Sequence, residues 1–155
     1  LVSTMRKTLL FSLGAVVLAG CDFSGGSDAV APISSLKAEN LPAATGPSAD
    51  LFFEVQDAVG RSYYRSAVQI GASTDSLETS VPASLEIPTA TSPMYIAVFD
   101  YENSLLESRM LARSTAFTAA ELTAAPLVLQ DAPFRNTGDS EATFTVTRSN
   151  AVSAE

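Results

Sequence analysis

Apolar and polar residues alternate along much of the chain after residue 50, and a period of two is typical of half-buried β-strands. In "LFFEVQ" (51–56) every second residue is apolar from Leu51 onward, and the turn signal "DAVGRS" follows. The next run, "YYRSAVQI" (63–70), has the same period and puts Ser66 and Ile70 on one face. The two runs together predict a β-hairpin.

Five later runs predict further strands. "VPASLEI" (81–87) alternates, but Pro82 restricts it to a sheet edge. "MYIAVFD" (94–100) is apolar on both faces, which indicates a central strand that is covered on both sides. The remaining strands are expected over 109–117, 127–130 and 142–148, the last with Ala142, Phe144 and Val146 facing inward.

One short helical turn is expected among these strands. Thr118 and Glu121 have the spacing of a capping box, and Pro126 would end the turn soon afterwards. Short strands separated by Gly, Pro, Asp and Asn turns are typical of an antiparallel sandwich. The sequence therefore predicts an all-β fold, an antiparallel β-sandwich of about seven or eight strands.

The start of the chain has the pattern of a signal peptide. Arg6 and Lys7 follow Met5, and an apolar run extends over residues 8–20. A helix of this length would span about 20 Å, which is too short for a hydrocarbon core of about 30 Å. We therefore expect residues 1–20 to be removed as a signal peptide.

The four residues Leu18, Ala19, Gly20 and Cys21 resemble the lipobox of bacterial lipoproteins, which consists of leucine, two small residues and cysteine. This resemblance implies a diacylglyceryl group on Cys21, cleavage before it, and attachment to a membrane of the cell envelope on its extracytoplasmic side. Asp22, directly after the cysteine, resembles the aspartate that retains lipoproteins in the inner membrane of some enteric bacteria. Because this signal does not hold in all bacteria, the inner and the outer membrane are both possible locations. The alternative is an ordinary secretory signal with an incidental cysteine.

The expected mature chain divides into three parts. Residues 21–48 are rich in Gly, Ala, Ser and Pro and are expected to form a lipidated, flexible tether, with a short strand over 33–36 as an alternative. The sandwich is expected over 49–148, and 149–155 as a disordered tail. Cys21 is the only cysteine, so lipidation would leave no thiol for a disulfide, a metal or a nucleophile.

Charge and composition narrow the possible functions. Removal of residues 1–20 leaves 135 residues with seven basic and 17 acidic side chains, a net charge of −10, which argues against nucleic acid as a partner. The chain has no histidine, and Lys37 is the only lysine after the signal peptide. Carboxylates among Asp100, Glu102 and Glu107 are the remaining acid–base candidates. A domain of this size leaves little room for a substrate cleft, so we expect no enzyme activity and no obligatory cofactor.

Two segments, "ADLFFEV" and "MYIAVFDYEN", are similar to strands of the C2 family, the sandwich domains named after the second conserved region of protein kinase C. The resemblance covers residues 49–148 and implies a C2-like sandwich, with an immunoglobulin-like one as the alternative. Calcium-binding members carry aspartates in two loops, and the matching positions here are Asp50, Asp100 and Glu102. The resemblance thus implies a weak calcium site, against the alternative that these acids are merely solvated.

The aromatic residues suggest a second kind of site. Sandwich domains often stack sugars on exposed rings, and the candidates are Tyr63, Tyr95 and Tyr101, with Phe52 and Phe99 behind them. We expect a membrane-anchored, non-enzymatic binding or structural module whose partner is an envelope protein or a glycan. A carbohydrate-binding module at the cell surface is the alternative.

Overall fold

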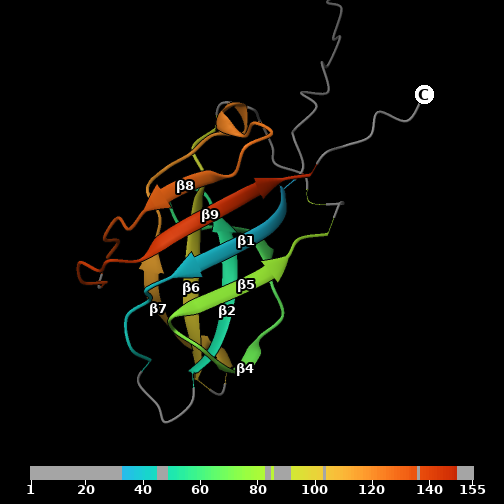
Figure 1. Cartoon of the computed structure of the whole chain (residues 1–155). Coiled ribbons are helices and arrows are strands. Elements are labelled where there is room, and N and C mark those ends of the chain that lie inside the picture. Colours follow the sequence, from blue (N-terminus) through green and yellow to red (C-terminus); the bar gives the residue numbers. More distant parts are fainter. Residues whose placement is uncertain are drawn as a thin grey trace, which may run out of the picture.

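A computed structural model of the chain describes residues 33–44, 49–82, 85, 92–102, 104–135 and 137–149. The expected signal peptide, Cys21 and residues 150–155 of the expected tail lie outside the described residues. The described part forms two antiparallel sheets that pack face to face, with one 3₁₀ turn (Figure 1). The expected all-β sandwich is confirmed.

The described residues contain nine strands. Their bounds are β1 Ile33–Glu39, β2 Ala49–Gln56, β3 Ser62–Arg65, β4 Gln69–Ala72, β5 Ser76–Ser80, β6 Tyr95–Glu102, β7 Ser104–Arg113, β8 Leu127–Gln130 and β9 Thr143–Arg148, with the 3₁₀ turn η1 at Ala119–Glu121. The four-stranded sheet has the order β5-β1-β9-β8. The five-stranded sheet has the order β3-β2-β6-β7, and β4 also pairs with β2.

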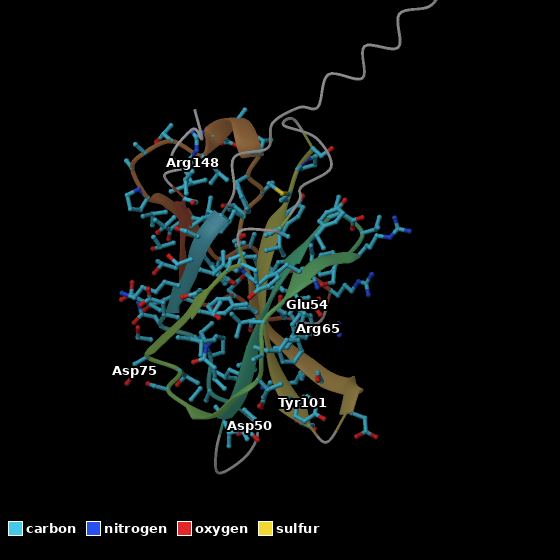
Figure 2. The ribbon with its side chains drawn as sticks, turned by 90° about the vertical axis from the view of Figure 1, so that its right-hand side faces the viewer. Asp50, Glu54, Arg65, Asp75, Tyr101 and Arg148 are labelled. Carbon is cyan, nitrogen blue, oxygen red and sulfur yellow. The ribbon has the colours of Figure 1, made fainter. Side chains whose placement is uncertain are left out.

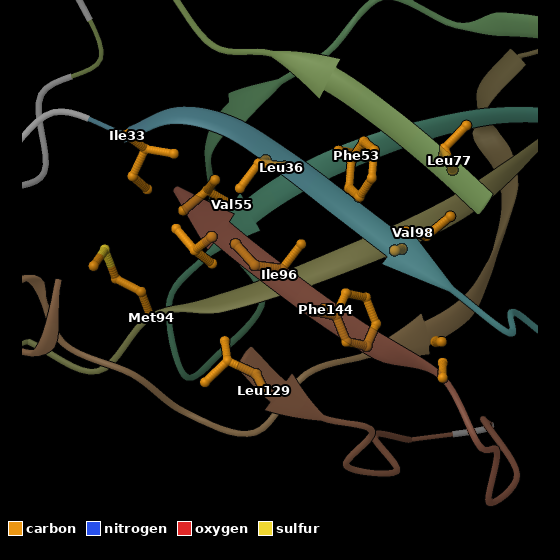
Figure 3. Close-up of a cluster of buried hydrophobic side chains, with 14 of the residues drawn as sticks. Ile33, Leu36, Phe53, Val55, Leu77, Met94, Ile96, Val98, Leu129 and Phe144 are labelled. Atoms are coloured by element: carbon orange, nitrogen blue, oxygen red, sulfur yellow. The ribbon is translucent and has the colours of Figure 1, made fainter. Parts of the chain in front are cut away.

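The core lies between the two sheets and follows the predicted alternation. Alternate residues of β2, β6 and β9 point into it, among them Phe53, Ile96 and Phe144 (Figure 3). Each fully buried side chain of this size contributes about 1.5–3 kcal/mol to the free energy of unfolding. The strands expected over 51–56, 94–100, 127–130 and 142–148 are confirmed, and so is the capping box, in which the Glu121 carboxylate accepts the Thr118 backbone N–H at 2.6 Å. The strand expected over 109–117 is confirmed only in part, because β7 begins at Ser104 and ends at Arg113, and Ser114 and Phe117 make isolated bridges.

Strand β1 shows that the expected tether over 21–48 is wrong for residues 33–39. β1 is an integral part of the sandwich, because it lies between β5 and β9 in the middle of its sheet. Ile33, Leu36 and Ala38 are all buried in the core. The register with β9 shifts between Ile33 and Ser35, and this irregularity lets Ile33 and Leu36 point to the same side although three positions separate them. The sandwich therefore begins at Ile33 and not at residue 49.

The strand expected over 81–87 is also displaced. The edge strand β5 ends at Ser80, and Val81 and Pro82 follow it without strand geometry. Within β5 only Leu77 is a buried apolar residue, so its alternation is too weak to read from the sequence. Residues 83, 84, 86 and 87 of the expected strand lie outside the described residues.

The run expected as one strand over 63–70 is broken at Ser66. Both β3 and β4 pair with β2, but Ser66, Ala67 and Val68 leave the ladder between them. The Ser66 hydroxyl accepts the Phe53 backbone N–H at 2.9 Å and donates to the Ala67 carbonyl at 3.0 Å. Ser66 is therefore buried, whereas Ile70, which the predicted alternation places on the same face, lies after the break and is 84% exposed.

Ser114 repeats this arrangement at the end of β7. Its hydroxyl accepts the Ile96 backbone N–H at 2.9 Å and donates to the Thr115 carbonyl at 2.8 Å. Each buried serine thus replaces a missing carbonyl acceptor beside a central strand. A buried N–H without an acceptor is costly, so these hydroxyls allow the ladder to end without exposing the core.

We predict that Leu36→Ala lowers the free energy of unfolding by about 2–5 kcal/mol, because it leaves a cavity in the core. Lys37→Ala on the same strand is the matched control and should have a much smaller effect, since it removes only a solvent-exposed ion pair with Glu39. Chemical denaturation measures both. Equal effects would contradict the assignment of β1 to the middle of the sheet.

We also predict that Ser114→Ala destabilises the protein by about 1–3 kcal/mol, because the Ile96 N–H is then buried without an acceptor. Ser62→Ala, at an exposed position of β3, should change the free energy of unfolding by less than about 0.5 kcal/mol. Thermal and urea unfolding compare the two variants. A neutral Ser114→Ala variant would show that another acceptor serves the Ile96 N–H.

Candidate functional site

The outer face of the five-stranded sheet, which is turned away from the core, is unusually well covered. Alternation along β2 and β6 places Phe52, Ala97 and Phe99 on this face, yet Phe52 and Ala97 are buried. The Phe52 and Phe99 rings are stacked with their centroids 5.2 Å apart. The predicted covering of β6 on both sides is therefore confirmed, by side chains and a loop on this outer face.

A buried carboxylate on the same face is internally paired. Glu54 is 4% exposed, and its Oε1 accepts the Arg65 Nε–H at 2.6 Å in a salt bridge (Figure 2). The Gln56 amide donates to the other carboxylate oxygen at 2.7 Å. The Arg65 guanidinium also lies 5.6 Å from the centroid of the Phe52 ring. These contacts engage both oxygens of the Glu54 carboxylate, so we assign it a structural role. The Gln56 amide oxygen is buried and has no hydrogen-bond partner among the described residues.

The Arg113 guanidinium joins this outer face to a distant loop. Its Cζ atom lies 3.7 Å from the centroid of the Tyr95 ring and 3.8 Å from that of Phe134, and one nitrogen donates to the Asp57 carbonyl at 2.6 Å. Burial lowers the pKa of Arg113 below its usual value, and the nearby Arg135 cation acts in the same direction. Arginine nevertheless stays protonated, so a cation is held permanently between two rings.

Beside this contact the loop and the sheet enclose an open groove of about 370 Å³, which we call the arginine groove. It is lined by Phe99, Ser108, Arg109, Met110, Phe134, Arg135 and Thr137. A smaller cavity of about 180 Å³ adjoins it and shares Arg109, Met110 and Thr137. The groove thus combines two aromatic rings and a thioether with two guanidinium groups.

The calcium site expected from Asp50, Asp100 and Glu102 is not formed. The Asp50 carboxylate accepts the Gly71 backbone N–H at 2.9 Å and so fastens β4 to β2. β6 continues as a strand to Glu102, and Asp100 is buried within it, so neither acid lies in a loop as the resemblance implied. Across the described segments, no group of three or more acidic, histidine or cysteine side chains is placed to hold a metal ion.

The expected aromatic platform for a sugar is largely occupied by internal contacts. Phe52 is 1% exposed and stacks on Phe99, and the Arg113 guanidinium covers the Tyr95 ring. Tyr63 and Tyr101 are partly exposed, and they lie on β3 and β6 respectively. The candidate site therefore lies at the arginine groove, where the sequence patterns predicted none.

We predict that Arg113→Lys destabilises the protein by about 1–3 kcal/mol, because a lysine ammonium cannot lie flat between two rings and still reach the Asp57 carbonyl. Arg148→Lys is the matched control at an exposed arginine and should stay within about 0.5 kcal/mol of the wild type. Urea unfolding measures both. An unchanged Arg113→Lys variant would contradict the role of guanidinium stacking.

Comparison with known proteins supplies few relatives. No protein-family model matches the chain, and no curated protein matches it. A C2 domain of plant Extended Synaptotagmin 1 is 12% identical, with a TM-score of 0.41 over 76% of this chain and 95% of that chain. The second C2 structure, BON1-C2B, is 13% identical, with a TM-score of 0.48 over 81% of this chain and 94% of that chain. Both are C2 domains, and the likeness concerns the fold alone.

Proposed function

We propose that this protein is a lipid-anchored, extracytoplasmic module of the bacterial cell envelope that acts by binding or by structural support and not by catalysis. The lipobox pattern Leu18 to Cys21, directly after an apolar run with Arg6 and Lys7 before it, carries the proposal. Burial of acyl methylenes contributes about 0.8 kcal/mol each, and two or more chains give a stable anchor. Within the described residues, no helix is long and apolar enough to cross a membrane.

The start of β1 at Ile33 limits how far an anchored domain can stand from the membrane. Eleven residues lie between Cys21 and Ile33, so twelve Cα-to-Cα steps join them. Even a fully extended chain of that length spans no more than about 40 Å. Because β1 is held by β5 on one side and β9 on the other, a pull on the anchor would act on the middle of a sheet.

The chemistry of the described residues supports a non-catalytic role. The chain has no histidine, and the buried carboxylate of Glu54 is neutralised by Arg65. The Asp50 carboxylate is engaged by the backbone of Gly71. These acids therefore serve the fold, and acid–base catalysis would need groups other than them.

We predict that Cys21→Ser moves the protein from the membrane to the soluble extracytoplasmic fraction, because no acyl chain can be attached. Asp22→Asn, which retains the thiol, is the control and should stay in the membrane fraction. Fractionation with immunoblotting measures the distribution, and intact mass spectrometry of the wild type should show a diacylglyceryl cysteine as the first residue. A Cys21→Ser protein that still sediments with membranes, or a native mass without acyl groups, would refute the anchor.

A further inference from the structure

We propose that the arginine groove binds a small organic acid, in which one carboxylate is attached to an apolar body. The proposal deepens the binding role given above by naming the class of ligand. The groove brings together an apolar surface and guanidinium groups, which such a ligand requires, in one cavity of about 370 Å³. This volume lies in the range of small-molecule sites and toward its lower end, which favours a small ligand over a macromolecule.

The apolar half of the groove is built from side chains that the fold already holds in place. Phe99 stacks on the buried Phe52, and Phe134 packs on the Arg113 guanidinium. Thr137 closes the loop by accepting the Phe134 backbone N–H at 2.7 Å. A ligand ring or chain would therefore meet a surface that needs little reordering, and the entropic cost of binding is correspondingly small.

The polar half consists of Arg109 and Arg135. Arg109 donates from one terminal nitrogen to the Ala43 carbonyl at 3.3 Å. Arg135 donates similarly to the Val59 carbonyl at 3.1 Å, and its guanidinium also lies 4.9 Å from the centroid of the Phe134 ring. Each hydrogen bond uses one terminal nitrogen of a guanidinium group that carries five N–H donors. None of the described residues that line the groove is acidic, although the whole chain has a net charge of −8. The acids nearby are Asp139, which lines the adjoining cavity, and Asp100, which lies opposite Arg109 in the β6–β7 ladder. The groove is thus a cationic spot on an acidic protein, and Arg is suited to pairing with a carboxylate.

The backbone conformation at Arg135 supports a role for this residue in ligand binding. Its φ angle is +57°, in the left-handed region where glycine is favoured and other residues carry a conformational cost. Such strain at a non-glycine residue is often found where a side chain serves a ligand site. A glycine at this position would carry no such cost, so the backbone conformation of the loop does not itself require an arginine.

Because of this strain, a variant at Arg135 can lose ligand binding and still fold, so the two effects can be distinguished. Arg135→Gly relieves the backbone but also removes the Val59 hydrogen bond and the contact with the Phe134 ring. These effects on the free energy of unfolding oppose each other, so the variant should melt within a few degrees of the wild type. Arg148→Gln is the charge-matched control, because Arg148 lies at the opposite end of β9 from the loop that carries Arg135. Circular dichroism checks the fold of each variant before binding is measured.

The probe is 4-phenylbutyrate, and its binding to the mature protein is measured by ligand-observed NMR. If the protein carries a lipid anchor, it is placed in zwitterionic nanodiscs, with empty nanodiscs as the blank. If it carries none, it is measured in buffer. We expect wild type and Arg148→Gln to bind with a Kd of about 1 mM or below. Arg135→Gly should bind at least about tenfold more weakly, and wild type should discriminate against the neutral 4-phenylbutanol by a similar factor.

Four results would overturn the proposal: no binding by the wild type, equal binding of acid and alcohol, equal weakening by Arg148→Gln, or a folded Arg135→Gly variant that binds normally. A peptide with a free carboxyl-terminal phenylalanine is a further arm. If it binds while 4-phenylbutyrate does not, the small-acid proposal is overturned in favour of a polypeptide terminus. The result is independent of the anchor, because binding is measured whether or not Cys21 carries lipid.

Discussion

The stacking of one buried guanidinium between two aromatic rings organises the outer half of this molecule. Arg113 ends the edge strand β7, Tyr95 begins β6, and Phe134 lies in the loop between β8 and β9, so the contact joins three segments. Without it the apolar outer surface of the five-stranded sheet would be exposed to water beside Ala97 and Phe99. A cation is suited to this position, because it binds both ring faces and still satisfies the Asp57 carbonyl.

The same contact explains why the groove exists. A loop pressed flat against the sheet would leave no space, whereas here Phe134 is fixed at one point and the chain then turns sharply at Arg135 with its positive φ. The groove lies beside this turn, and residues of both the loop and β7 line it. Stability and a candidate binding site thus depend on one arrangement, in which the stacked cation supports the strained residue next to its partner ring.

The sequence predicted the elements whose burial pattern is regular and missed those whose pattern is interrupted. The alternation of β2 and β9 is visible because each directs one residue in two toward the core. β6 was predicted from a continuous apolar run instead, because both of its faces are covered. For β1 the sequence favoured a tether and gave a short strand over 33–36 only as the alternative, because a register shift changes the phase of this strand between Ile33 and Leu36. The ladder break at Ser66 could not be predicted from the period alone. The groove could not be predicted at all, since Phe99, Met110 and Arg135 come from three elements and no local spacing relates them. The dipeptide Phe134-Arg135 in a polar loop was its only sequence signal.

The direction of β1 relates the candidate groove to the proposed anchor. In the pairing with β9, Ile33 lies opposite Arg148, and Glu39 lies opposite Thr143, beside the end of the loop that forms the groove. Pro42, just after β1, lines the cavity that adjoins the groove. Seven residues of strand span about 20 Å, so the groove lies roughly that far along the sheet from the point where the chain arrives from Cys21. An anchor at Cys21 would therefore attach to one end of the sheet and leave the groove toward the other, where a ligand from the surrounding solution can reach it.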